Sequence, residues 1–126
     1  MDRSANSRRY PARIGRLREW RGPILCRITE QTAASAFEIG AEEVASATRG
    51  SSQAALARQV GMYLAHVVCG LSLTEVGRLY GRDRTTVAHA CAVVEDRRDD
   101  PTFNRAISAL EYAVRQRGQM LIEQSQ

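Results

Sequence analysis

A short helix with clear signals at both ends does most to restrict what this chain can fold into. Ser72 and Glu75 form a capping box, in which each side chain satisfies a free backbone amide at a helix start. Gly81 can end that helix because it has no Cβ and enters the left-handed backbone region freely. Asp83 follows at once and suits the N-cap of another helix. The pattern predicts a helix-turn-helix over Ser72–Arg98.

The rest of the chain also predicts helices. Apolar residues recur at steps of three and four, which is the spacing of a helical face buried against a core. Prolines and glycines suit the first turns and the ends of these helices. No alternating strand pattern is found, so we predict an all-α fold of about six helices. The other expected helices cover residues 23–36 (beginning at Pro23), 41–47, 53–69 and 101–118 (ending at Gly118).

Charge divides the chain into zones. Residues 1–22 hold seven Arg against two acidic residues, residues 23–44 are net acidic, and residues 45–90 are net basic. All 18 cationic residues are Arg, which suits contacts with phosphate and guanine, although genome base composition produces the same bias. The expected organisation is a basic, mostly disordered N-terminal arm over 1–22 with a short helix near 14–20, a helical domain over 23–118 and a C-terminal tail over 119–126.

Composition argues against several classes of protein. No apolar run approaches the roughly 18 residues that span a bilayer, and we expect no secretory signal and no membrane partner. Three scattered cysteines, an odd number, do not suggest a disulfide framework, so we expect a cytoplasmic protein. Cysteine and histidine lack metal-ligand spacing, and no catalytic constellation is evident. We expect neither an enzyme nor a cofactor or metal site.

The start of the second helix of the pair carries chemistry suited to DNA. Arg84 can pair with guanine O6 and N7, the Thr85 and Thr86 methyl groups can touch thymine, and Asp83 can accept from cytosine N4. In a helix-turn-helix these N-terminal residues enter the major groove. The alternative is an ordinary helical hairpin with a polar start. The basic charge of residues 45–90 favours DNA binding.

Three stretches of the chain resemble the C-terminal DNA-binding domain (domain IV) of the bacterial replication initiator DnaA. They are Arg58–Ala65, Ser72–Gly77 and Gly81–Ala90, and the run Gly-Arg-Asp-Arg-Thr-Thr-Val-Ala-His-Ala is the most specific. The resemblance covers about residues 25–117. It implies an all-α fold that reads duplex DNA with the second helix of the pair.

The resemblance also implies roles for individual residues. Base contacts are implied at Asp83, Arg84, Thr85 and Thr74. Phosphate or backbone contacts are implied at Arg58, Gln59, His66, Ser72, Arg82 and Thr86, and we add Arg49 and His89 as candidates.

Three positions depart from the family pattern. The family usually has His where this chain has Arg84, and two glycines where it has only Gly81. Leu56 stands where the family has an Arg that enters the minor groove, and Arg49 or the basic arm is a candidate substitute. These differences argue against recognition of an identical DNA box.

The chain has no Gly-x-x-x-x-Gly-Lys-Ser/Thr motif and no Lys, so we expect no nucleotide binding and no initiator ATPase. It resembles stand-alone relatives of the DNA-binding domain that regulate transcription in alphaproteobacteria. Some of these activate gene transfer agent genes with RNA polymerase or a sigma-like partner. We therefore expect a nucleoid-associated regulator of transcription. The alternatives are a replication regulator competing with DnaA for its boxes and a protein-interaction module without specific DNA binding.

Each of two charged segments allows two interpretations of its role. The N-terminal arm suits contact with the DNA backbone or minor groove, or else a polar or protein-binding tail. Asp96, Asp99 and Asp100, with Arg97 and Arg98, suit a solvated helix end, or else a patch that binds a partner.

Overall fold

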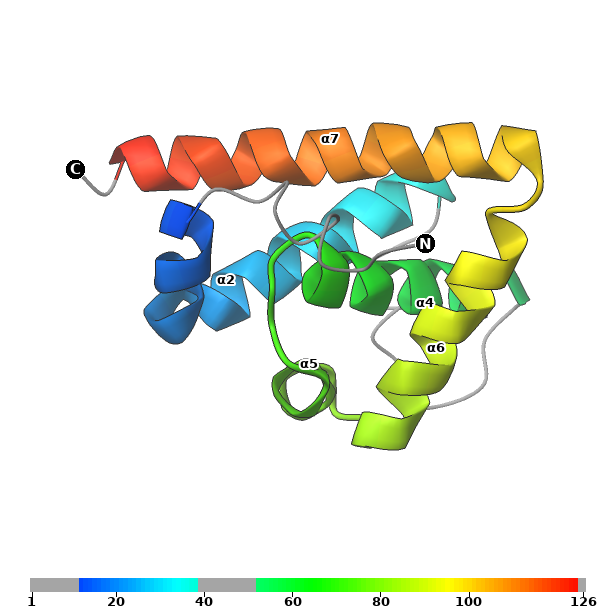
Figure 1. The fold of residues 1–126 in the computed structure, drawn as a ribbon, viewed down its shortest axis with the longest axis horizontal. Coiled ribbons are helices and arrows are strands. Elements are labelled where there is room, and N and C mark those ends of the chain that lie inside the picture. Colours follow the sequence, from blue (N-terminus) through cyan, green and yellow to red (C-terminus); the bar gives the residue numbers. More distant parts are fainter. Residues whose placement is uncertain (1–11, 39–51, 125–126) are drawn as a thin grey trace.

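The computed structural model describes residues 12–38 and 52–124, and all the regular structure in these two segments is helical (Figure 1). This confirms the predicted all-α fold. The described helices are α2 (Ala12–Ala36), α4 (Ser52–Val67), α5 (Leu73–Tyr80), α6 (Arg84–Arg97) and α7 (Pro101–Gln124).

The helices form one packed body beneath α7. Figure 1 shows α7 lying across one side, α2 and α4 beneath it, and α5 on the opposite side of the molecule. Helix α6 runs from the level of α5 up to the start of α7. Helix α2 packs against both α4 and α7, while α6 packs against α4 and α5. The start of α6 is therefore presented far from α7.

Helix α4 is the centre of the core. The middle of its apolar stripe, predicted from spacing, is buried: Val60 and Leu64 are fully enclosed, and the whole stretch from Val60 to Ala65 is buried. Leu56 and Val67, nearer the ends of α4, are partly buried. Gly70 follows α4 with a φ of 75°, so it ends the helix in the left-handed conformation as expected. Val87 and Val94 of α6 and Ile107 and Val114 of α7 complete the same core cluster.

Two expected helix ends are wrong. Pro23 was expected in a first turn, but α2 begins at Ala12 and Pro23 lies in its interior, where a proline lacks the amide for one helical bond. Burial of Leu25 and Ile28 in the core helps to hold the helix on the far side of this proline. Gly118 was expected to end the last helix, but it is buried inside α7, which continues to Gln124.

Some expectations fall outside the described residues. These are the short helix over 41–47, Arg49 and residues 1–11 of the arm. None of the helices in the described part of the chain has both the length and the apolarity that crossing a bilayer requires.

Candidate nucleic-acid interface

Helix α5 begins as the sequence predicts. The Ser72 side chain accepts a hydrogen bond of 3.0 Å from the backbone N–H of Glu75, which is one half of the capping box. Ser72 and Thr74 are exposed at this end of the helix. Both side chains are therefore available to an external partner, as their predicted backbone and base-edge contacts require.

The far end of α5 is fixed by an aromatic anchor that the sequence reasoning missed. Tyr80 is the last residue of α5, and its side chain reaches α2. Its hydroxyl makes a 2.9 Å hydrogen bond with Thr29 of α2, which is fully buried. Burial raises the pKa of the Tyr80 hydroxyl, so it stays protonated. The sequence signal was a tyrosine at the end of an amphipathic helix, but its partner lies 51 residues away.

The turn between α5 and α6 depends on two glycines. Gly81 takes the left-handed conformation (φ 69°) and donates to the carbonyl of Gly77, which also accepts from Arg82 at 2.8 Å. A Cβ on Gly77 would lie only 2.5 Å from the carbonyl oxygen of Arg82. The turn therefore packs directly on the α5 backbone, and this contact sets the distance between the two helices.

The start of α6 exposes four consecutive polar side chains. Asp83 has N-cap backbone angles (φ −69°, ψ 152°), but its carboxylate makes no capping hydrogen bond, contrary to the expectation that this side chain caps the helix. Asp83, Arg84, Thr85 and Thr86 are all exposed, whereas the next residue, Val87, is fully buried. Burial of Val87 thus holds the start of α6 against the core, while the residues before it, Asp83–Thr86, face solvent.

A pair of arginines lies beside this start. Arg58 of α4 is partly buried, and its burial, together with the nearby Arg82 guanidinium, lowers the pKa of Arg58. The Arg82 guanidinium also donates 3.3 Å hydrogen bonds to the carbonyls of Tyr80 and Gly81, which orients it across the turn. Two neighbouring guanidinium groups repel one another, and a phosphate between them would relieve that repulsion.

The remaining predicted contacts are less uniform in exposure. Gln59 is partly buried on α4, and His89 is exposed on α6. One ring nitrogen of His66, Nδ1, makes a 2.7 Å hydrogen bond with the carbonyl of Leu71, so the ring is oriented by the loop before α5. Leu56, at the family's minor-groove arginine position, is partly buried against the core.

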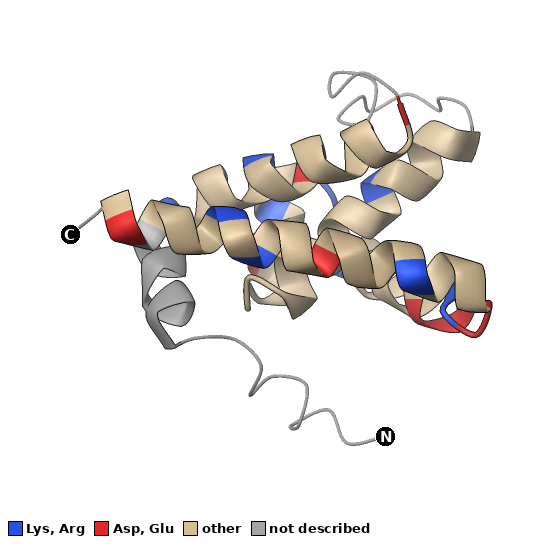
Figure 2. Cartoon of the chain, turned by 90° about the horizontal axis from the view of Figure 1, so that it is seen from above, with Lys and Arg blue, Asp and Glu red and all other residues tan. Residues whose placement is uncertain are grey.

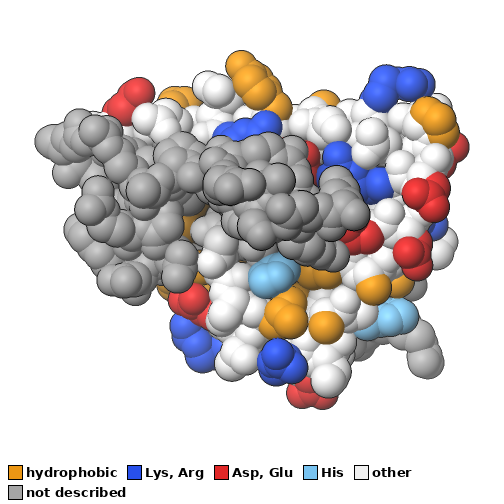
Figure 3. Space-filling model, viewed as in Figure 1, with side chains coloured by type: hydrophobic (Ala, Val, Ile, Leu, Met, Phe, Trp, Pro, Cys, Tyr) orange, Lys and Arg blue, Asp and Glu red, His pale blue; other side chains and the backbone are white. Residues whose placement is uncertain are grey.

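Charge is distributed unevenly over the molecule. In Figure 3 basic side chains appear at the lower edge, where α5 and the start of α6 lie, with acidic side chains next to them. Acidic side chains gather instead on the side where α6 ends and α7 begins. The structure thus brings together the predicted contacts on α5, the turn, α6 and part of α4, and their roles as base or phosphate contacts stay predictions.

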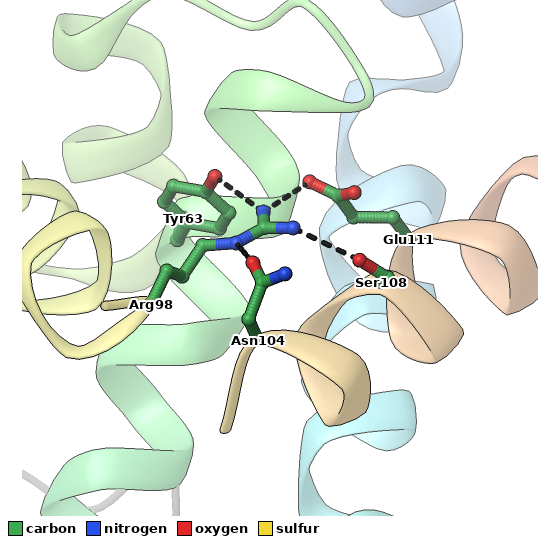
Figure 4. Close-up of polar contacts among 5 residues, drawn as sticks. All are labelled: Tyr63, Arg98, Asn104, Ser108 and Glu111. Atoms are coloured by element: carbon green, nitrogen blue, oxygen red, sulfur yellow. Dashed lines mark hydrogen bonds and ion pairs between the residues drawn. The ribbon is translucent and has the colours of Figure 1, made fainter. Parts of the chain in front are cut away.

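A partly buried polar network at the other end of α6 was not predicted. The guanidinium of Arg98 donates to the Asn104 side chain at 2.6 Å, the Tyr63 hydroxyl at 2.9 Å and the Ser108 hydroxyl at 3.0 Å (Figure 4). It also forms a 2.9 Å ion pair with Glu111, whose side chain is only 3% exposed. Arg98 therefore ties the end of α6 to both α4 and α7, rather than belonging to a solvated helix end.

The cysteines show no sign of a site. Cys26 and Cys69 are buried, and burial raises the pKa of each thiol to about 12. Both thiols therefore stay protonated at neutral pH and pack as small apolar groups. Within residues 12–38 and 52–124, no group of three potential metal ligands comes together.

Comparison with protein families places these features in a known context. The family model described as "Bacterial dnaA protein helix-turn-helix" matches residues 27–94, which is more than half of the chain. The match includes α4, α5, the turn and most of α6, and therefore all the described residues assigned a DNA contact.

Individual relatives agree with the family match. The chain is 41% identical over 76 residues to the chromosomal replication initiator protein DnaA of Lachnoclostridium phytofermentans, and 36% identical over 81 residues to that of Desulfotalea psychrophila. These alignments cover 59% and 64% of this chain but only 17% of each relative. The chain thus spans about a sixth of the length of these relatives.

A solved structure has a similar fold. It is described as the crystal structure of a DNA replication initiation factor, and it superposes with a TM-score of 0.68 at 31% sequence identity. The superposition covers 81% of this chain and 31% of the other.

Proposed function

Because this chain belongs to the bacterial DnaA helix-turn-helix family, we propose that it is a sequence-specific reader of duplex DNA that regulates transcription. The four exposed residues Asp83–Thr86, held at the start of α6 by the turn on Gly77, carry this proposal. Their donors and acceptors suit base edges in the major groove, and the helix N-terminus favours a phosphate.

In this proposal the surrounding residues position the domain on the DNA backbone. Arg58 and Arg82 are near enough to interact electrostatically, so both can contribute positive charge toward the phosphate backbone, and Ser72 offers a hydroxyl at the start of α5. Such contacts carry affinity without sequence information, whereas Asp83, Arg84 and Thr85 discriminate between base pairs. We also propose that the role is non-enzymatic and is exercised at the nucleoid.

The choice of transcription over replication rests on departures from the family pattern. Arg84 replaces the usual His at a base-reading position, and the turn has one glycine where the family has two. Both changes favour a target sequence different from the initiator's box. Activation of gene transfer agent genes with RNA polymerase or a sigma-like factor is the finer form of this proposal.

A second candidate is a replication regulator that competes with the initiator for its boxes. It is favoured by the relatives, which are described as chromosomal replication initiator proteins.

In vitro selection from random duplex DNA at near-physiological salt tests both candidates. The purified chain is mixed with the random pool and with the initiator's own box as competitor. An enriched motif unlike the box supports transcription control, and enrichment of the box moves the function to replication. Failure to enrich any motif would overturn sequence-specific reading. Arg105→Ala, an exposed arginine on α7, is the control variant and should enrich the same motif as the unchanged chain.

A further inference from the structure

An apolar groove opens between the end of α2 and the start of α7, at the end of α6 that lies away from the turn. Its volume is about 740 Å³. Four partly buried apolar side chains line it, from α4, α7 and the turn that follows α2, each also packed on the core: Phe37, Leu56, Phe103 and Leu110. Because these side chains already rest on the core, they form a fixed wall rather than a loose surface.

The shape of the groove suits a helix. Its α7 rim carries the small exposed residues Ala106 and Ala109, which allow another backbone to approach closely. The groove continues into a second hollow that shares Ala36 and Leu110 and reaches Arg117. From Phe103 to Arg117, α7 rises about 21 Å, which matches about four turns of a partner helix.

The two ends of the groove differ in charge. Asp96 and Asp100 line the first end and are exposed, and Figure 2 shows acidic residues gathered at this end of α7. The neighbouring Arg97 lies over the Phe103 ring, 5.1 Å from its centroid, and the guanidinium of Arg98 is engaged with Glu111. The first end is therefore the more acidic, while Arg117 marks the other.

We propose that this groove binds an amphipathic helix of a protein partner, with apolar residues at helical spacing and Arg or Lys at the end that lies over Asp96 and Asp100. The apolar face of such a helix would pack against the apolar wall of the groove, and its basic residues would neutralise the Asp96 and Asp100 carboxylates. DNA does not fit, because phosphate is repelled by the same carboxylates. Segment 39–51 of this chain does not match either, since its two glutamates and one arginine make it net acidic.

The groove and the DNA-reading turn lie at opposite ends of α6, which has 14 residues and is about 21 Å long. The partner helix therefore binds while the start of α6 remains accessible. This inference goes beyond DNA reading and does not depend on which DNA sequence is read.

The test uses the full chain and two labelled synthetic helical peptides. Both carry leucines at i, i+3, i+4 and i+7 steps. One ends in three arginines and the other in three glutamates at the same positions. Fluorescence anisotropy should show the arginine peptide binding about tenfold more tightly than the glutamate peptide. Weak or equal binding of both peptides would overturn the proposal.

Matched variants locate the site. Asp96→Arg should reverse the preference between the peptides, whereas Glu123→Arg, the same charge change at the far end of α7, should not. Ala106→Trp should fill the groove and abolish binding, whereas Gln116→Trp, also exposed on α7, should leave it intact. Binding that survives both Asp96→Arg and Ala106→Trp would place the peptide elsewhere and overturn the proposal. Self-association of the chain that Ala106→Trp abolishes would make the occupant a second copy, which also overturns it.

Discussion

The two ends of α6 use polar side chains in opposite ways. At the start, Asp83, Arg84 and Thr85 face solvent, and the Asp83 carboxylate does not cap its own helix. At the end, Arg98 is hydrogen-bonded to four side chains, among them the buried Glu111. The first end leaves its polar groups for an external partner, and the second satisfies them within the fold. Exposure and internal pairing therefore separate the proposed DNA-contact residues from structural ones more clearly than residue type does.

Arg98→Ala should produce the largest effect. It leaves the Glu111 carboxylate buried without its cation, and we expect a loss of about 3 kcal/mol in the free energy of unfolding. Urea denaturation measures this loss. Arg97→Ala is the matched control, because Arg97 is exposed and lies over the Phe103 ring, and it should cost less than about 1 kcal/mol.

The Arg98→Ala variant also tests whether the two ends of α6 act independently. Under conditions where Arg98→Ala is folded, its order of preference among DNA sequences should be unchanged. An altered order would mean that the two ends of α6 are not independent.

Gly77→Ala should come next and should affect both stability and DNA binding. The new Cβ would meet the Arg82 carbonyl at 2.5 Å, so the turn must shift, at a cost of about 2 kcal/mol. The shift also moves the start of α6, so DNA affinity should fall in the molecules that remain folded. Thermal unfolding and a DNA titration measure the two effects. Arg78→Ala, next to it and exposed on α5, should change stability by less than about 0.5 kcal/mol.

Arg84→Ala should leave the fold intact and change recognition. We expect a loss of about 2 kcal/mol in binding to the preferred site and relaxed preference at one base pair. A competition titration against single-base variants of the selected site measures this. An equal loss on every sequence would reassign Arg84 as a phosphate contact.

Arg58→Ala should have the smallest and most uniform effect. It should weaken binding to all sequences alike and lower the slope of log affinity against log salt by about one. Titrations at several salt concentrations measure the slope. Loss confined to particular sequences would show that Arg58 reads bases.

Local signals were the predictable part of the fold and the site. The Ser72 cap, the stop at Gly81 and the Asp100–Pro101 start of α7 are confirmed, the last by a 2.8 Å hydrogen bond from the Phe103 amide to Asp100. Each depends on residues within one turn of one another, so a single stretch of sequence contains the whole interaction.

Interactions between distant residues were not predictable. Arg98 is hydrogen-bonded to Tyr63, 35 positions away in the sequence, and to Glu111, 13 positions away. No residue near Arg98 in the sequence distinguishes it from Arg97. Pro23 was wrongly predicted to begin a helix. Its neighbours Leu25 and Ile28 stabilise α2 by packing in the core, and the preference of proline for the first turn of a helix takes no account of such packing. In the site, the assignment of DNA contacts to these side chains stays a prediction, and the expected capping of α6 by the Asp83 side chain is wrong.

The exposed start of α6 also has a consequence for how the protein can change over generations. Side chains that perform no folding task can be exchanged with little loss of stability, typically within about 0.5 kcal/mol. If Arg84 and Thr85 read bases as proposed, substitutions there would alter target preference without first having to be compensated elsewhere, because Val87 and the Gly77 contact keep the helix in place. Under the proposed function, such an arrangement would let a lineage acquire new DNA targets by single substitutions on an unchanged scaffold.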